Sequence, residues 1–307
     1  MKIAILSNSD AFFPLAYALL GQQISPSIFY SPSPDSHTNQ QVIAFVSQAG
    51  VNFTEEKQPD KDLYNWLTQG NYDVCFVVGY KHLIDIDRLK NCPTPIFNIH
   101  FGPLPAYRGA TPVFWQLKNG EQNIGLCIHS LSQKFDDGPV VWLKETTNLP
   151  HYNYRSVNLL FNQLCVEGVF YILQLIINKL PIPLIQRDGI RSSYQKRPGL
   201  NEVTINWQQM DAAEICNLIR AGNPWNKGAI TFFNGQEIKL MDAIVIANEA
   251  QDQKNAEPGS ITVENGQLNI CCRDGNSIQV NMLFYNECYI PEYQCMHWGF
   301  LTGKKLG

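Results

Sequence analysis

Short apolar runs alternate with amphipathic segments along the first half of the chain. The runs are rich in β-branched and aromatic residues and are bounded by polar or turn-forming residues, which is typical of buried strands. They predict strands at residues 2–6, 27–30, 74–78, 96–100, 125–130 and 140–144. The intervening segments predict helices at residues 13–20, 39–49, 63–68 and 112–118. This order indicates an α/β domain, doubly wound and Rossmann-like, whose parallel strands are connected by crossover helices.

The pattern changes after about residue 145. Residues 153–178 carry apolar side chains at a spacing closer to the helical than to the strand period, which predicts a long helix packed across the sheet. Residues 181–201 contain prolines and show little periodicity, so we interpret them as a connecting arm. We place the first domain at residues 1–190 and a linker at residues 191–205.

The remaining residues, 206–307, predict a smaller domain. Asp211 and Glu214 have the spacing of a capping box, which predicts a short helix that ends at Gly222. Three turn-forming pairs follow between strand-forming residues, Asn-Gly at 234–235 and 265–266 and Asp-Gly at 274–275. Such pairs favour tight hairpins. We therefore expect a C-terminal β-rich, barrel-like domain.

Composition narrows the class of protein. A length of 307 residues favours two domains, and a hydrophobic content of 45% is ample for a core. The nine cysteines form no Cys-x-x-Cys pair and no His/Cys cluster at zinc spacing, so we predict no metal site. The chain begins with strand-like residues rather than a signal peptide, and its most apolar later stretch, residues 168–177, is too short to span a membrane. We expect a cytoplasmic protein without a membrane partner.

The candidate catalytic residues lie at and after the end of the strand predicted at 96–100. Asn98 and His100 are two apart, so on a strand their side chains project from the same face. A loop rich in Gly and Pro follows, where substrates of open α/β sheets bind. Asp136 lies further along, two residues before Gly138. Acyl transfer needs an oxyanion stabiliser, a proton acceptor and a group that orients the acceptor, and an amide, an imidazole and a carboxylate supply them.

These motifs resemble those of the 10-formyltetrahydrofolate-dependent formyltransferases. The match consists of Asn-x-His at 98–100, Leu-Pro-x-x-Arg-Gly at 104–109 and Asp-x-Gly at 136–138, in that order. Two later segments, residues 205–207 and 220–225, resemble the C-terminal part of methionyl-tRNA formyltransferase. The resemblance implies transfer of a formyl group to a primary amine. In that reaction Asn98 donates a hydrogen bond to the oxyanion, His100 accepts a proton and Asp136 orients His100.

The resemblance also implies the binding residues. Two loops whose backbone holds the pteridine ring of 10-formyltetrahydrofolate correspond to Tyr80, Lys81, His82, Leu83 and Ile84 and to Gln133, Lys134, Phe135 and Asp137. The acceptor loop corresponds to Gly102, Pro103, Leu104, Arg108 and Gly109. Asp137 replaces a hydroxylated residue of the family pattern. This leaves open whether Asp136 or Asp137 is the catalytic aspartate, and it adds negative charge beside the folate. A dinucleotide cofactor is not expected, because no Gly-x-Gly-x-x-Gly follows the first strand.

The charge distribution bears on the amine acceptor. No Lys or Arg lies between Ile3 and Glu56, and residues 200–307 contain seven Lys or Arg against twelve Asp or Glu. Because neutralisation of phosphates by basic side chains supplies much of the affinity for nucleic acids, this argues against tRNA. A nucleotide-linked amino sugar or a carrier-tethered aminoacyl group fits the charge better, and methionyl-tRNA stays an alternative. Formyltetrahydrofolate hydrolysis and a non-catalytic folate-binding module are further alternatives.

Overall fold

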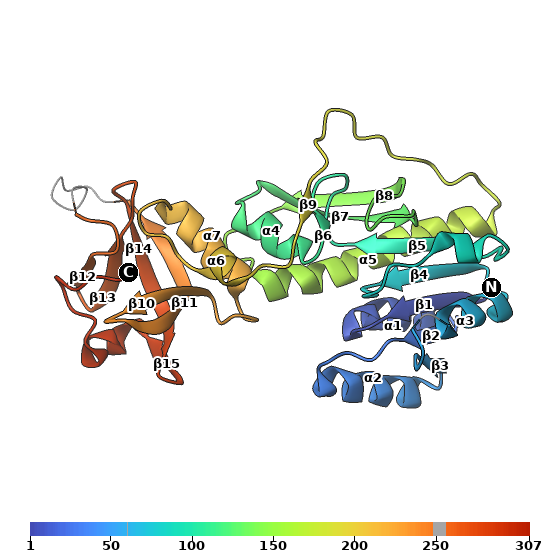
Figure 1. Cartoon of the computed structure of the whole chain (residues 1–307), viewed down its shortest axis with the longest axis horizontal. Coiled ribbons are helices and arrows are strands. Elements are labelled where there is room, and N and C mark those ends of the chain that lie inside the picture. The colour runs from blue at the N-terminus through green and yellow to red at the C-terminus, as the bar shows by residue number, and fades with distance from the viewer. Residues whose placement is uncertain (60, 248–255) are drawn as a thin grey trace. The chain divides into compact units, whose positions relative to one another are not determined.

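A computed structural model describes residues 1–59, 61–247 and 256–307. The contacts within it define two compact units, each described separately below (Figure 1). Unit 1 comprises residues 1–109, 125–146 and 159–195, and unit 2 comprises residues 110–124, 147–158 and 196–307.

Unit 1 is built on a seven-stranded sheet in the order β3-β2-β1-β4-β5-β7-β8. The strands are β1 (Ile3–Ser7), β2 (Ser27–Tyr30), β3 (Asn52–Glu55), β4 (Val74–Val78), β5 (Ile96–His100), β7 (Asn123–Ser130) and β8 (Val140–Thr147). The first five in sheet order are parallel, which confirms the doubly wound prediction for this part. The prediction of parallel strands throughout is wrong for β7, which pairs antiparallel with β5.

Strand β3 has no counterpart in the sequence prediction. Its residues are Asn-Phe-Thr-Glu, and both end residues are exposed because the strand forms the edge of the sheet. By contrast, all five residues of β1 and of β4 are buried in the middle of the sheet. Central strands therefore carry the apolar signal that makes them predictable, and a short polar edge strand does not.

The α-helices of unit 1 lie close to their predicted positions. They are α1 (Phe13–Gly21), α2 (Ser36–Ala49), α3 (Asp62–Gly70) and α5 (Tyr154–Ile177), whose first residues belong to unit 2. The 3-10 helices η1 (Asp10–Phe12) and η2 (Ile86–Leu89) have no counterpart in the sequence prediction. Helix α2 begins three residues earlier than predicted, because the Asp35 carboxylate accepts hydrogen bonds from the N–H groups of His37 and Thr38.

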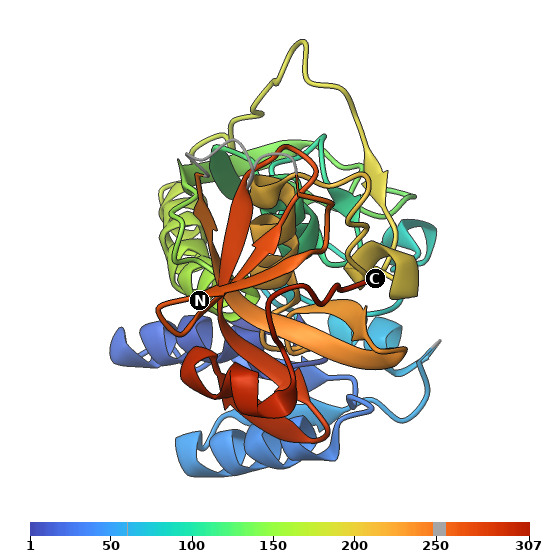
Figure 2. The ribbon, with the colours of Figure 1, turned by 90° about the vertical axis from the view of Figure 1, so that its left-hand side faces the viewer.

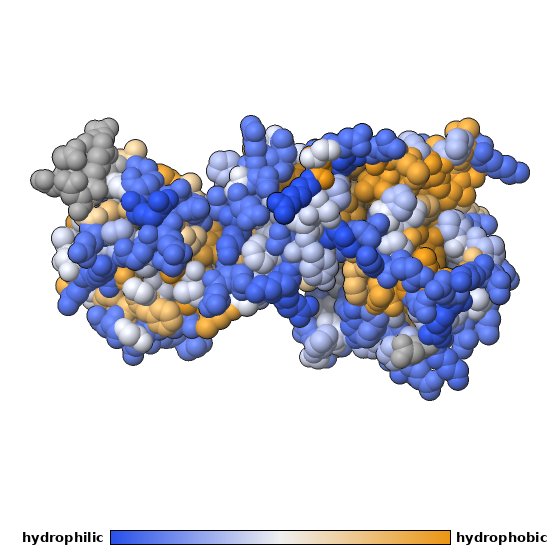
Figure 3. All heavy atoms as spheres, turned by 45° about the horizontal axis from the view of Figure 1, so that its top comes forward, coloured by the Kyte–Doolittle hydropathy of each residue, from blue (hydrophilic) through white to orange (hydrophobic). Residues whose placement is uncertain are grey.

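Helix α5 provides the apolar cover of the sheet. Phe161, Cys165 and Val169 are fully buried at a four-residue spacing, and Gly168 allows the helix to pack closely on the Trp142 ring. Of the described residues, only this helix is long and apolar enough to cross a membrane, a test that core helices of globular proteins also pass. The apolar segment is thus the whole helix Tyr154–Ile177, which is longer than the predicted residues 168–177. Figure 3 shows an apolar area on the exposed surface of unit 1. The cytoplasmic location stays a prediction.

Unit 2 contains an antiparallel sheet, as predicted. Its strands are β10 (Ala229–Phe233), β11 (Gln236–Ile246), β12 (Ile261–Glu264), β13 (Gln267–Cys271), β14 (Ser277–Tyr285) and β15 (Cys288–Pro291), and the 3-10 helix η3 (Glu292–Trp298) follows. The three turn-forming pairs connect β10 to β11, β12 to β13 and β13 to β14. Residues 304–307 bridge the two edge strands through Phe233 and Ser260, which gives the barrel-like closure (Figure 2).

Three helices complete unit 2, namely α4 (Pro112–Lys118), α6 (Leu200–Val203) and α7 (Ala212–Gly222). Helix α7 has the predicted capping box and the predicted end. The predicted first domain, residues 1–190, includes helix α4, whereas the contacts of α4 place it in unit 2. Lys118 Nζ donates to the Glu202 carbonyl oxygen at 2.7 Å, and the Phe114 and Trp225 rings are 5.8 Å apart.

The arm predicted as irregular is partly ordered on unit 1. Its strand β9 (Tyr194–Gln195) pairs with the short strand β6 (Arg108–Gly109).

Candidate active site

Antiparallel strands β5 and β7 position three polar side chains. Asn98 and His100 lie two residues apart on β5, and His129 of β7 is directly opposite Asn98 in the register. Asn98 Nδ2 lies 3.0 Å from His129 Nε2, and only 2% of the His129 surface is exposed. The sheet thus brings one amide and two imidazoles together, and the sequence analysis did not anticipate the second imidazole.

The carboxylate of Asp136 joins this cluster from the loop between β7 and β8. Its Oδ1 atom lies 3.3 Å from Asn98 Nδ2, 3.4 Å from His100 Nδ1 and 3.5 Å from His129 Nε2. Its Oδ2 atom accepts a hydrogen bond of 2.9 Å from the Gly109 N–H. One side chain, 10% exposed, therefore contacts all three polar groups of the strands.

The loop that carries Asp136 is tightly constrained. Asp136 has a φ of 51°, in the left-handed region that residues other than glycine seldom adopt. A Cβ atom on Gly138 would lie 1.7 Å from the Ser130 carbonyl oxygen, so only glycine lets the loop fold back on β7. A strained backbone of this kind persists where its surroundings hold it in place.

Arg108 holds the same loop on both sides of Asp136. One terminal nitrogen donates to the Phe135 carbonyl oxygen at 2.9 Å, and the other forms an ion pair of 2.8 Å with Asp137. The structure therefore places Asp136 against Asn98 and His100 and directs Asp137 to Arg108. The additional negative charge expected from Asp137 is thus paired.

The contacts of His129 determine its neutral tautomer. Nδ1 lies 2.8 Å from the Ser130 carbonyl oxygen, so this nitrogen carries a hydrogen and donates it. Nε2 of the neutral ring then accepts from the Asn98 amide, whose second hydrogen faces Asp136. Both amide hydrogens thus have acceptors within the protein. Asn98 can donate to an oxyanion only if one of these two hydrogens turns towards the substrate. The contact with Asp136, at 3.3 Å, is longer than the contact with His129, at 3.0 Å, so the hydrogen that faces Asp136 is the one released more easily.

His100 uses one ring nitrogen to bond to the backbone. Nε2 lies 2.7 Å from the Tyr107 carbonyl oxygen and donates to it, which leaves Nδ1 facing Asp136 as the proton acceptor. Burial lowers the pKa of His100, and the opposing effects of Asp136 and the Tyr107 carbonyl do not restore the ordinary value. The ring is therefore neutral at neutral pH, as proton acceptance requires.

The carboxyl of Asp136 is charged under the same conditions. Burial disfavours its charged form, but the interactions with the His129 and His100 rings and the hydrogen bond from the Gly109 N–H together outweigh burial and lower its pKa. A carboxylate beside neutral His100 favours uptake of a proton by the ring. The pair can therefore accept a proton from an attacking amine.

The first loop predicted to bind folate, residues 80–84, follows β4. The Tyr80 hydroxyl donates to Glu56 Oε1 at 2.6 Å, and Lys81 Nζ donates to the Pro32 carbonyl oxygen at 3.0 Å. The side chain of Ile84 is buried in the core of unit 1. The side chains of Tyr80, Lys81 and Ile84 are therefore engaged within the protein, whereas that of Leu83 is exposed. Contact of folate with the backbone of this loop stays a prediction.

The second predicted folate loop lies next to the first. The side chain of Gln133 is hydrogen-bonded to Asp87 of η2, which follows the first loop, and helps to lower the pKa of Asp87. Phe135 is exposed, and its carbonyl oxygen accepts from Arg108. The contact between Gln133 and Asp87 connects the second loop to η2, the element that follows the first loop.

The acceptor loop packs directly on the candidate catalytic residues. A Cβ atom on Gly102 would lie 2.8 Å from His100 Nε2, so the absence of a side chain lets the loop approach the ring. Arg187, from the arm, donates to the carbonyl oxygens of Pro103 and Leu104 at 2.8 and 3.2 Å. The same guanidinium bonds to Glu145 at 2.9 Å.

The arm also fixes the backbone of residues 107–109, which includes the carbonyl group that accepts a hydrogen bond from His100. The Tyr107 N–H donates to Ser193 Oγ, and the Arg108 N–H donates to the Ser193 carbonyl oxygen, both at 3.0 Å. Gly109 pairs with Gln195. Because the Tyr107 carbonyl accepts from His100, the arm contributes to the position of the catalytic ring.

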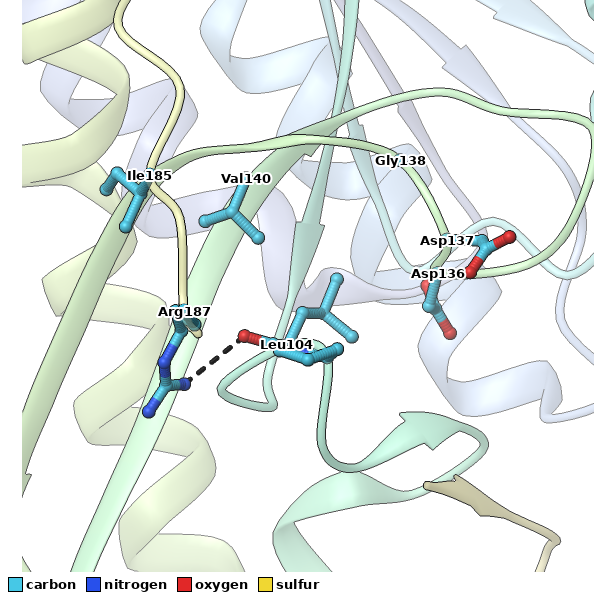
Figure 4. A pocket seen from close by; sticks show the side chains of 8 residues that line it. Leu104, Asp136, Asp137, Gly138, Val140, Ile185 and Arg187 are labelled. Atoms are coloured by element: carbon cyan, nitrogen blue, oxygen red, sulfur yellow. Dashed lines mark hydrogen bonds between the residues drawn. The ribbon is translucent and has the colours of Figure 1, made fainter. Parts of the chain in front are cut away.

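A small pocket of about 130 Å³ opens beside Asp136. Figure 4 shows the guanidinium of Arg187 and the two aspartates on opposite sides of Leu104. The pocket is lined by Leu104, Pro105, Asp136, Asp137, Gly138, Val140, Ile185 and Arg187. It combines apolar walls with a carboxylate of the catalytic cluster, as small-molecule sites do.

Three residues of this site escaped the sequence analysis. His129 ends a predicted strand next to the one with Asn98, so its position carried a usable signal. Arg187 and Ser193 lie in the arm, more than eighty residues from the acceptor-loop groups that they contact, and no local pattern marks them. Among the described residues no group of three or more His, Cys, Asp or Glu side chains is arranged to hold a metal ion.

Comparisons with known proteins agree with the fold and the motifs. The family "Formyl transferase" matches residues 28–168, and "Formyl transferase, C-terminal domain" matches residues 200–286. Methionyl-tRNA formyltransferase of Dictyoglomus thermophilum is 31% identical over 225 residues, which cover 69% of this chain and 71% of that protein. The same enzyme of Chlorobium chlorochromatii is 32% identical over 58% of this chain and 56% of its own length.

Two solved structures share the fold. WlaRD, a sugar 3N-formyl transferase determined with dTDP and 5-N-formyl-THF, has a TM-score of 0.69 at 18% identity over 91% of this chain and 97% of its own. The N-formyltransferase of Helicobacter canadensis, determined with folinic acid and dTDP-3-aminofucose, has a TM-score of 0.67 at 16% identity over 91% and 98%. At this identity the likeness establishes the architecture.

Proposed function

Because this chain belongs to the formyl transferase family, we propose that it moves a formyl group from 10-formyltetrahydrofolate to a primary amine. The acceptor is a nucleotide-linked amino sugar or a carrier-tethered aminoacyl group. The observation that carries this proposal is the approach of Asp136 Oδ1 to both Asn98 and His100, at 3.3 and 3.4 Å. This cluster lies beside a pocket and holds all three groups that acyl transfer needs.

The amine must lose a proton during attack on the formyl carbon. As the new carbon–nitrogen bond forms, positive charge develops on the amine nitrogen and negative charge on the formyl oxygen. Nδ1 of neutral His100 accepts the proton, and the carboxylate of Asp136 stabilises the resulting imidazolium. The bond between the formyl carbon and the folate nitrogen then breaks while the proton held by His100 passes to that nitrogen, which releases tetrahydrofolate and restores neutral His100.

Asn98 stabilises the developing oxyanion. Its amide is oriented by Nε2 of His129 and by Asp136, so it is held in place before the substrate arrives. Uptake of the proton by His100 gives Asp136 a stronger partner, which releases the longer amide contact for the oxyanion. Preorganised donors of this kind account for much of the catalysis in acyl transfer.

The formyl donor is inferred from the family and from two solved structures that contain folates. Both structures were determined with a formylated tetrahydrofolate or folinic acid. In this chain the corresponding loops are residues 80–84, which follow β4, and residues 133–137, which include Asp136 of the cluster. We therefore assign the folate to these loops and the amine to the side of Arg108 and Gly109.

Methionyl-tRNA is the second candidate acceptor, because the relative from Dictyoglomus thermophilum carries that activity in its name. The charge distribution favours the other acceptors, since no Lys or Arg lies between Ile3 and Glu56. WlaRD is named a sugar 3N-formyl transferase, and the Helicobacter canadensis structure contains dTDP-3-aminofucose.

The decisive experiment is a panel of acceptors assayed with 10-formyltetrahydrofolate. Methionyl-tRNA, amino-sugar nucleotides and carrier-tethered amino acids are each incubated with the enzyme, and both tetrahydrofolate and formylated product are measured. We expect stoichiometric transfer to an amino sugar or a tethered amino acid and loss of transfer in His100→Ala. Efficient, strongly salt-sensitive transfer to methionyl-tRNA alone would overturn the preferred acceptors. Unchanged turnover in His100→Ala would overturn the mechanism.

A further inference from the structure

Arg108 is a largely buried cation next to the reacting groups. Its side chain is 17% exposed, and the N–H of the following residue, Gly109, donates to Asp136. One terminal nitrogen donates to the Phe135 carbonyl, and Nε is buried with no hydrogen-bond partner among the described residues. The compensating charge for this guanidinium is therefore the carboxylate of Asp137, at 2.8 Å.

Asp137 is the more exposed partner of its ion pair with Arg108. Its side chain is 43% exposed, and it lines the pocket beside Asp136, whereas Arg108 does not. An anionic group that enters the pocket meets the carboxylate of Asp137 before it can reach the guanidinium. The negative charge of Asp137 repels a second negative charge in the pocket, so the approach of a phosphate or carboxylate is unfavourable.

Arg187, the cation that does line the pocket, is compensated in the same way. Arg187 lines the pocket, and its guanidinium bonds to Glu145 at 2.9 Å and to two backbone carbonyl oxygens. Each arginine thus has its own carboxylate, and Asp136 adds one further negative charge. The pocket is therefore suited to an amine and poorly suited to an anion.

We propose that Asp137 is a specificity-determining residue, which occupies Arg108 and disfavours acceptors with a phosphate or carboxylate next to the reacting amine. This inference rests on the proposed function. The acceptor class that it selects is an amine whose neighbouring groups are uncharged, with any phosphate several bonds away. Replacement of Asp137 by a neutral residue would leave a buried cation without compensation, a state that strongly favours uptake of an anion.

The test is the affinity of the full chain for inorganic phosphate, measured by isothermal titration calorimetry at low ionic strength. We expect Asp137→Ser to bind phosphate at least about tenfold more tightly than wild type, because Arg108 becomes available. Arg108→Gln in the Asp137→Ser background should remove this gain. Phosphate binding requires no turnover, so the result does not depend on the formyl-transfer assay.

Glu167→Gln is the matched control, because it also removes a carboxylate from an ion pair, here with exposed Lys144 at 3.1 Å. A solvated lysine gains little phosphate affinity from this change. Equal phosphate affinity in wild type and Asp137→Ser overturns the proposal, as does an equal gain in Glu167→Gln. If the double variant is unfolded by circular dichroism, the comparison of wild type with Asp137→Ser decides alone.

Discussion

The two sides of Asp136 are built differently. On one side, strands β5 and β7 present Asn98, His100 and His129, which are held by backbone pairing in the middle of a sheet. On the other side, loops and the arm present Arg108 and Arg187, which are held by ion pairs and by backbone carbonyls. The strand side is rigid and buried, and the loop side is more exposed.

This difference separates chemistry from selection. The reacting groups need fixed distances and a neutral imidazole, which a buried sheet provides. The loop side can change its charge pairs without a change in the sheet, so it can adapt one reaction to different amines. We therefore expect substitutions on the strand side to lower kcat and substitutions on the loop side to alter KM and acceptor choice.

The largest effect is expected for Asp136→Asn. The substitution keeps the shape of the side chain but removes the charge that stabilises protonated His100, so kcat should fall by about 10³-fold or more. Steady-state formation of tetrahydrofolate measures this loss. A decrease of less than about tenfold, in a protein with wild-type circular dichroism, would show that Asp136 does not act in proton transfer.

A smaller loss is expected for Asn98→Ala. Removal of one oxyanion donor commonly costs about 3–4 kcal/mol, so kcat should fall by about 10²- to 10³-fold with a retained fold. The KM for folate should change little, because the interaction is made mainly in the transition state. An increase in KM with unchanged kcat would instead assign Asn98 to ground-state binding.

The pH dependence of kcat tests the state of His100. The ring must be neutral to accept a proton, and burial lowers its pKa, so activity should fall only as the pH drops below the ordinary histidine value of about 6.5. The acid limb of kcat, measured at saturating donor and acceptor, reports this group. An acid limb with its midpoint at or above about 6.5 would contradict the burial of a neutral His100.

The smallest effect is expected on the loop side, for Arg187→Ala. Loss of the bonds to Pro103, Leu104 and Glu145 should loosen the acceptor loop and raise the acceptor KM about threefold to tenfold, with kcat within about threefold of wild type. Lys144→Ala, which also removes an ion-paired cation, is the control. A kcat loss as large as that of Asn98→Ala would abolish the proposed division between the two sides.

The sequence predicts the strand side well and the loop side poorly. The central strands and the position of Asn98 and His100 follow from apolar runs and the two-residue period, which depend on neighbouring residues. Other contacts depend on residues far apart in the sequence. The antiparallel register brings His129 opposite Asn98, 31 positions away, and Arg187 contacts Leu104, 83 positions away. Local patterns contain no information about such pairings, so the missed residues are those fixed by tertiary contacts.

The central claim is that Asp136, rather than its neighbour, couples the proton acceptor to the amide. The most direct measurement is kcat for formyl transfer by Asp136→Asn and Asp137→Asn, assayed side by side with the same donor and acceptor. Since only Asp136 contacts His100 and Asn98, we predict that Asp136→Asn is at least about 100-fold slower than Asp137→Asn. Equal rates, or a slower Asp137→Asn, would contradict the account.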